Sequence, residues 1–171
     1  MRKLRGWFRF DSDSAVFGRI RACKAPAFER ESVSNMKIVV IDGQGGRLGR
    51  LLVEGVKERL PQAQVYALGT NSIATAAMLK AGADFGATGE NPVVRGTADA
   101  DAVLGPVGIV VAHSILGEVT PAMAEAVGGC RAKKFLIPMN SCGVVVAGVR
   151  EQPLPSYVAQ ALDQMMQELG R

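Results

Sequence analysis

From Met36 onward, short apolar runs alternate with segments whose apolar residues recur at helical spacing. Residues 37–42 (KIVVID) form a mostly apolar run, which is typical of a strand buried on both faces of a parallel sheet. Residues 46–60 follow with apolar residues on one helical face, and Pro61 ends that helix. Because strands and helices alternate, the sequence predicts an α/β chain with a three-layer Rossmann-like fold and a mainly parallel sheet.

The rest of the chain continues this alternation. Further strands are expected at 64–69, 101–105, 134–139 and 144–149, and further helices at 72–82, from 120 to about 127, and at 155–169. Two segments are less regular. Residues 83–94 are short-stranded and rich in turns. Residues 106–116 fit a strand by their β-branched residues and a helix by Pro106 and Gly117, so both alternatives stay open.

The net charge of +4 lies entirely in residues 1–35, since the remaining residues carry twelve basic and twelve acidic side chains. Residues 1–35 have no clean period and no apolar stretch of the kind a secretory signal needs. We expect translation to start at Met36 and residues 1–35 to be a disordered or non-native extension; the alternative is an arginine-rich arm that contacts a partner or a membrane surface. Residues 36–171 are expected to form a single domain.

Charge, hydropathy and cysteine content narrow the setting. The neutral main body predicts no nucleic-acid partner, and its apolar runs are shorter than the roughly 20 residues of a membrane span. Three cysteines without a CxxC pair indicate neither a disulfide framework nor a zinc site, so a cytoplasmic location is expected. Few charges and a mean hydropathy of +0.15 favour a homo-oligomer.

A glycine-rich loop follows the first predicted strand, in the stretch 41–50 (IDGQGGRLGR). Such a loop between a strand and a helix points backbone N–H groups at an anion. A dinucleotide fingerprint, G-x-G-x-x-G, needs a third glycine where this chain has Leu48. The sequence therefore predicts a phosphate-sized anion site rather than a complete fingerprint, and a tight turn without ligand is the alternative. Its candidate binding residues are Asp42, Gly43, Gln44, Gly45, Gly46 and Gly49.

The loop after the second strand lacks the acid that would hold the ribose of NAD. It carries Thr70, Asn71 and Ser72 instead, with no nearby arginine for NADP. These three side chains could extend the ligand site, or Asn71 or Ser72 could serve only as the N-cap of the next helix. The cofactor is therefore unknown, with NAD(P) or flavin mononucleotide as candidate nucleotides.

Other candidates are weaker. Glu90 follows a short turn, and His113 is the only histidine, although a lone histidine in an apolar run is more typical of a packing residue. Both are retained as weak catalytic candidates. Asn140 lies in the loop after the strand that begins at Lys134 and is a candidate ligand contact. No cluster with metal-ligand spacing exists, so no metal is expected.

Several motifs together carry a family resemblance. MKIVVIDGQGGRLGRLLVE, ALGTNSIATAAMLKAGADFGATGEN, GPVGIVVAHSILGEVTPAMAEAV and KKFLIPMN occur in order between residues 36 and 149. These four motifs, in this order, resemble those of an uncharacterised bacterial domain-of-unknown-function family, number thirty-eight forty-two. The resemblance implies a small cytoplasmic α/β protein beginning at Met36 and brings no activity. In addition, NSIA at 71–74 and PMN at 138–140 are similar to motifs that hold flavin mononucleotide phosphate and substrate in flavin-containing cysteine decarboxylases.

Three functions are compatible with these features. The first is binding of a nucleotide or another phosphate-bearing small ligand at the loop after the first strand. The second is a non-catalytic sensor or oligomeric accessory protein without a nucleotide, and the third is a flavin mononucleotide-dependent enzyme. The sequence favours the first and leaves open whether the chain is an enzyme.

Overall fold

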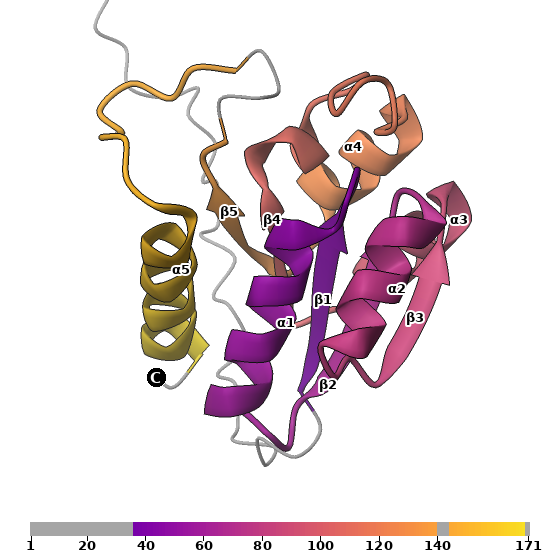
Figure 1. Ribbon diagram of the computed structural model, residues 1–171. Coiled ribbons are helices and arrows are strands. Elements are labelled where there is room, and N and C mark those ends of the chain that lie inside the picture. Colours follow the sequence, from indigo (N-terminus) through magenta and orange to yellow (C-terminus); the bar gives the residue numbers. More distant parts are fainter. Residues whose placement is uncertain (1–35, 140–143, 170–171) are drawn as a thin grey trace, which may run out of the picture. The chain divides into compact units, whose positions relative to one another are not determined.

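Five parallel strands form one sheet, in the order β3-β2-β1-β4-β5 (Figure 1). This computed structural model describes residues 36–139 and 144–169. The parallel sheet expected from the alternating pattern is confirmed within those residues. Its strands are β1 (Lys37–Asp42), β2 (Gln64–Gly69), β3 (Phe85–Thr88), β4 (Ala102–Pro106) and β5 (Lys133–Ile137).

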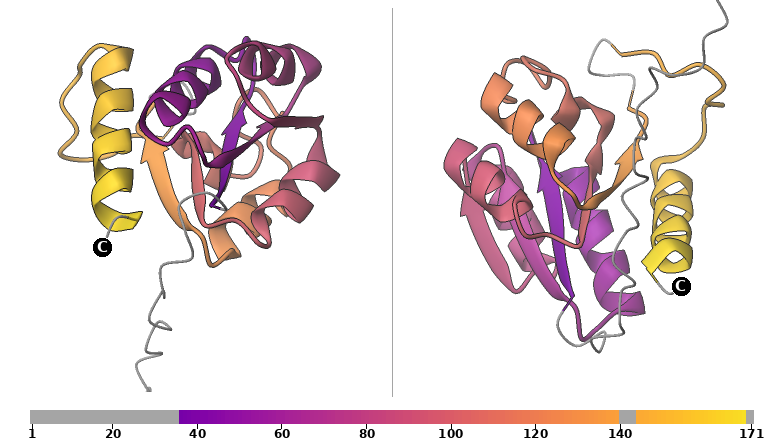
Figure 2. Two further views of the ribbon diagram at one scale, coloured as in Figure 1. Left: turned by 90° about the horizontal axis from the view of Figure 1, so that it is seen from below. Right: turned by 180° about the vertical axis from the view of Figure 1, so that it is seen from behind.

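Helices cover both faces of the sheet, which confirms the three-layer architecture (Figure 2). One face packs against α1, α2 and α5, and the other against α3 and α4. None of the helices within the described residues is both long and apolar enough to cross a membrane. Their bounds are α1 (Arg47–Arg59), α2 (Ser72–Lys80), α3 (Glu90–Thr97), α4 (Pro121–Gly129) and α5 (Leu154–Leu169), with a short 3₁₀ helix η2 (Val107–Val110).

The two helical layers explain why the first strand is apolar along its length. Ile38 and Val40 pack into the core beneath α1 and α5, whereas Val39 and Ile41 pack into the core beneath α3 and α4. All four side chains are at most 1% exposed. A central strand with helices on both sides has no solvent face, so the alternation of apolar and polar residues is lost. This places the end of β1, at Asp42, in the middle of the sheet.

The strand expected at 144–149 is wrong. These residues are irregular, with a turn at Ala147-Gly148, and Val145 is 87% exposed. The preference of valine for strands reflects packing on a neighbouring strand, and no strand of the described residues pairs with this segment. The valine run therefore lies between β5 and α5 without joining the sheet.

The two irregular segments differ in outcome. In 83–94 the short strand is β3, but the sequence missed α3, whose third residue is Pro92. Proline is tolerated in the first turn of a helix because its missing N–H would have no partner there. In 106–116 neither a long strand nor a long helix forms: β4 ends at Pro106, η2 follows, and the remaining residues are turns.

Candidate functional site

The order of the strands singles out one place on the sheet. The chain runs outward from β1 through β2 to β3, and then returns to place β4 on the other side of β1. The carboxyl ends of β1 and β4 are therefore the point where the connections change direction. In open parallel sheets, ligands bind outside the carboxyl ends of the strands at such a point.

A cleft of about 240 Å³ lies at this point. The β1 loop, defined as residues 43–46, forms one wall together with the first turn of α1. Pro106, at the end of β4, and Ile115 form another part, and Met139 and Leu154 complete the lining. The volume is slightly below the roughly 300–1,000 Å³ of sites for drug-sized ligands. The cleft therefore suits a small group such as a phosphate or a phosphorylated fragment.

Asp42 ends β1 and holds the β1 loop in place. Its Oδ1 accepts a hydrogen bond from the Gly43 amide (2.8 Å) and its Oδ2 one from the Gly49 amide (2.6 Å). Only 6% of the residue is exposed. Burial raises the pKa of Asp42 above its usual range, although the bonds from the Gly49 and Gly43 amides oppose that rise. Both oxygens are thus directed at the backbone that begins α1.

The start of α1 is close to α2 and carries no acid of its own. Gly46, the N-cap residue, has φ +69° and no side chain to cap the helix, and no acid occupies the first turn. A Cβ on Gly46 would lie 2.7 Å from Ala74 Cα, so only glycine fits. Within the described residues, the Gly45 and Arg47 amides have no acceptor. Both residues line the cleft.

A carboxylate from a distant loop binds on the β2 side of the β1 loop. Glu118 lies between η2 and α4, and its Oε2 accepts from the Gln44 amide (3.0 Å), the Asn71 side-chain amide (3.0 Å) and the Thr70 hydroxyl. Partial burial works to raise the pKa of Glu118, but the hydrogen bonds from Thr70, Gln44 and Asn71 outweigh it and hold that pKa below its usual range. The donors near this loop therefore already bind one anion, which belongs to the protein.

Asn71 joins the loops that follow β1 and β2. Its Oδ1 accepts from the Ala74 amide (2.9 Å), which confirms Asn71 as the N-cap of α2. Its Nδ2 donates to Gln44 O (3.0 Å) as well as to Glu118. The Thr70 amide donates to Asp42 O (3.0 Å). Thr70 and Asn71 thus fix the loop after β2 to the β1 loop.

The remaining sequence candidates do not all meet at the cleft. Ser72 is exposed at the start of α2, and Glu90 is exposed at the start of α3, beyond the edge strand β3. His113 is exposed, with φ +65°, so it is not a packing residue. The neighbouring Ser114 is buried and its hydroxyl donates to Gly108 O, which gives no Ser–His pair. Asn140 lies outside the described residues.

Sequence reasoning missed Glu118 as a partner of the β1 loop, and it missed Arg47, Ile115, Met139 and Leu154 as lining. The one available signal was the carboxylate after Gly117, in a loop that follows a strand and so reaches the same edge of the sheet. Nothing in the sequence says which neighbouring loop it contacts. In the part of the chain that the structure describes, no three His, Cys, Asp or Glu residues form a potential metal site.

Comparisons with known proteins agree with the fold. The family model described as "Domain of unknown function (DUF3842)" matches residues 37–170, and the chain belongs to that family. A search of curated proteins finds no match. Among solved structures, the chain is similar to a dodecameric FMN-dependent Ubix-like decarboxylase from Escherichia coli O157:H7. That match has 12% identity and a TM-score of 0.42, and it covers 80% of this chain and 95% of the other.

Proposed function

We propose that this member of the DUF3842 family binds a small phosphate-bearing ligand in the cleft at the carboxyl ends of β1 and β4. One observation carries the proposal: Gly45 and Arg47 line the cleft, and within the described residues their amides have no acceptor. The first N–H groups of a helix favour an anion, because they are unpaired and lie at the positive end of the helix dipole.

The side chain of Arg47 supports an anionic ligand. It is exposed, lines the cleft, and forms no ion pair with a described residue. A positive charge on the first residue of a helix is unfavourable next to the positive end of the helix dipole. A bound phosphate would offset that repulsion and accept hydrogen bonds from both the guanidinium and the backbone.

Asp42 also lines the cleft, and its negative charge would oppose a phosphate. However, both of its oxygens accept from backbone amides, and burial raises its pKa. Its charge is therefore partly balanced by the same helix start. The proposal is one of binding, with no reaction assigned, and it applies equally to a phosphate ester, a nucleotide or a flavin phosphate.

Calorimetric titration of the full chain with inorganic phosphate tests the proposal. A Cβ on Gly45 meets no protein atom within 4 Å, so Gly45→Val fills open space without a clash inside the protein. We expect millimolar binding by the natural chain and an affinity about tenfold weaker or worse for Gly45→Val, since the added methyl groups occupy the ligand's place.

The matched control is Gly128→Val, in α4, where a Cβ also meets nothing within 4 Å. It should bind phosphate as the natural chain does. A natural chain that gives neither heat nor a thermal shift with phosphate would overturn the proposal. Equal binding by Gly45→Val would move the site away from the β1 loop. If phosphate binds at the β1 loop, native mass spectrometry of the purified chain and thermal shifts with NAD, NADP, flavin mononucleotide, ATP and GTP would identify the ligand.

A further inference from the structure

Glu118 makes all of its described hydrogen bonds through a single oxygen. The Gln44 amide, the Thr70 hydroxyl and the Asn71 side-chain amide all donate to Oε2. No described residue donates to Oε1. Within the described residues, Arg59 Nη1 is the only buried side-chain nitrogen or oxygen without a partner, so Oε1 is not sealed inside the protein. One oxygen is therefore held in place while the other remains able to accept.

The carboxylate lies directly beside the cleft. A Cβ on Gly43 would be 2.6 Å from Glu118 Oε2 and 3.0 Å from Ile115 Cγ2. Gly43 and Ile115 both line the cleft. Gly43 therefore adjoins both the cleft and Glu118. On this side of Gly43 the nearest polar atoms are Glu118 Oε2 and Thr70 Oγ1, each 2.6 Å from the same Cβ position.

The loop that carries Glu118 has an unusual backbone. His113, Ile115 and Leu116 have φ values of +65°, +53° and +56°, and none of them is glycine. The left-handed conformation costs about 1–2 kcal/mol for an ordinary residue. Leu116 is 92% exposed, so no burial of its own side chain accounts for that conformation. Strain of this kind persists when it positions something, and here the following residues deliver Glu118 to the β1 loop.

We propose that Glu118 is the specificity-determining residue of the site and that its Oε1 accepts a hydrogen bond from a hydroxyl group of the ligand. The ligand class is then a phosphate ester of a polyol, with the chemistry of a ribose 5-phosphate group. In dinucleotide-binding folds a carboxylate at the end of the second strand holds ribose hydroxyls. Here the acid comes from the loop after β4, and Thr70 and Asn71 hold it at the end of β2. This inference rests on the proposed phosphate site.

Four probes separate the two proposals in calorimetric titrations of the full chain: inorganic phosphate, ribose 5-phosphate, adenosine 5′-monophosphate and its 2′,3′-dideoxy analogue. Phosphate alone tests the proposed function. We expect adenosine 5′-monophosphate to bind about tenfold tighter than its dideoxy analogue, the effect of a hydrogen bond to a charged group. Ribose 5-phosphate shows whether the base contributes to binding. If it binds as tightly as adenosine 5′-monophosphate, the ligand class is a sugar phosphate; if it binds more weakly, the ligand class is a nucleotide. The hydroxyl contact to Glu118 is part of both outcomes.

Variants locate the effect at Glu118. Glu118→Ala should remove the advantage of the hydroxyls, so that the nucleotide and its dideoxy analogue bind this variant with the same affinity, whereas Glu125→Ala, a change at an exposed acid on α4, should keep the advantage. Glu118→Gln keeps an oxygen for the three donors and should lose part of the advantage, which covers the case in which Glu118→Ala fails to fold. Two results would overturn this inference and leave the proposed function standing. In the first, the natural chain binds phosphate but has the same affinity for adenosine 5′-monophosphate and its dideoxy analogue. In the second, Glu118→Ala prefers the nucleotide over the analogue as strongly as the natural chain does.

Discussion

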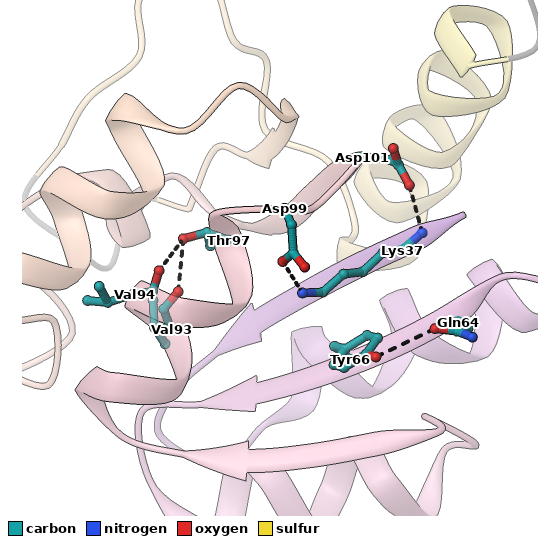
Figure 3. Close-up of polar contacts among 8 residues, drawn as sticks. All are labelled: Lys37, Gln64, Tyr66, Val93, Val94, Thr97, Asp99 and Asp101. Carbon is teal, nitrogen blue, oxygen red and sulfur yellow. Dashed lines mark hydrogen bonds and ion pairs between the residues drawn. The ribbon is translucent and has the colours of Figure 1, made fainter. Parts of the chain in front are cut away.

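The two ends of the sheet use polar groups in different ways. At the amino ends, charged side chains pair with one another and with the backbone. Lys37 Nζ bonds Asp99, and the Lys37 amide donates to Asp101 (2.8 Å) (Figure 3). Asp84 likewise accepts from Lys57 Nζ (2.6 Å) and from the Val65 amide (2.7 Å). These hydrogen bonds and ion pairs join the amino ends of the strands to neighbouring segments.

At the carboxyl ends, small residues replace these pairs. Gly43 and Gly46 let the backbone of the β1 loop approach its neighbours closely, Gly45 leaves open space, and Arg47 has no acidic partner among the described residues. The comparison shows that charge alone does not locate a site, since the amino ends are the more charged. What marks the carboxyl ends is the presence of donors and an acceptor without a partner among the described residues: the Gly45 and Arg47 amides and Glu118 Oε1.

The largest effect is expected from a change that breaks the carboxyl end. Gly46→Ala would force a left-handed residue with a Cβ 2.7 Å from Ala74 Cα. We expect the free energy of unfolding to fall by about 3 kcal/mol, from backbone strain together with the clash between α1 and α2. Urea unfolding followed by circular dichroism measures it. Gly45→Ala is the control, expected within about 0.5 kcal/mol of the natural chain; equal stability of the two variants would contradict the prediction.

A smaller effect would sharpen the description of the amino end. Lys57 and the Val65 amide outweigh partial burial and hold the pKa of Asp84 below its ordinary value of 3.8. Folding therefore favours the ionised form. Its contribution to stability is fully present above the unfolded pKa and is lost as the pH falls through the folded pKa. Asp84→Asn should reduce the loss of unfolding free energy at acid pH. The change should be less than about 1 kcal/mol, because the Lys57–Asp84 pair is solvent-accessible.

Unfolding free energies measured from neutral pH down through the acid range would check this. Lys57→Met removes the main cation and should flatten the same limb of the curve. Asp42, at the carboxyl end, has the opposite sign: its raised pKa favours the protonated form, so that contribution is lost as the pH rises through the folded pKa. An acid limb that keeps its full slope in Asp84→Asn would show that other carboxylates cause the loss.

The smallest effect is expected from deletion of residues 1–35. Every residue of the two described cores lies at or after Met36. The chain beginning at Met36 should keep its unfolding free energy within about 0.5 kcal/mol and its phosphate affinity unchanged. A chain beginning at Val39 would lose Ile38 from the core and serves as the unstable control. Loss of folding on deletion of 1–35 would contradict the prediction, because it would mean that these residues contribute to the stability of the sheet.

The pattern of apolar residues predicted the elements whose periodicity is set by the core. β1 and β2 have the predicted bounds, and α5 buries Val158, Leu162 and Met165 on its predicted inner face. The segment 144–149 failed because valine indicates a strand only if a partner strand is present. Likewise α3 was missed because Pro92 suggests a break unless the helix begins just before it.

The candidate site divides in the same way. The sequence located the β1 loop and the loop after β2 at one edge, because each follows a predicted strand. It did not place Glu118 between them, since 74 residues separate Glu118 from Gln44 and no local pattern encodes that contact. Ligand binding by these residues is a prediction, and the phosphate titration tests it.

Glu118 also affects how much conformational freedom the proposed site would lose when a ligand binds. Its Oε2 joins the loop after β4 to the loops after β1 and β2 through three hydrogen bonds. A pocket whose walls are already tied together is preorganised, so little conformational entropy remains to be lost when a ligand enters. We therefore expect association of the proposed ligand to be governed by encounter and desolvation, and protection of the Gln44 amide from hydrogen exchange would report that its bond to Glu118 persists.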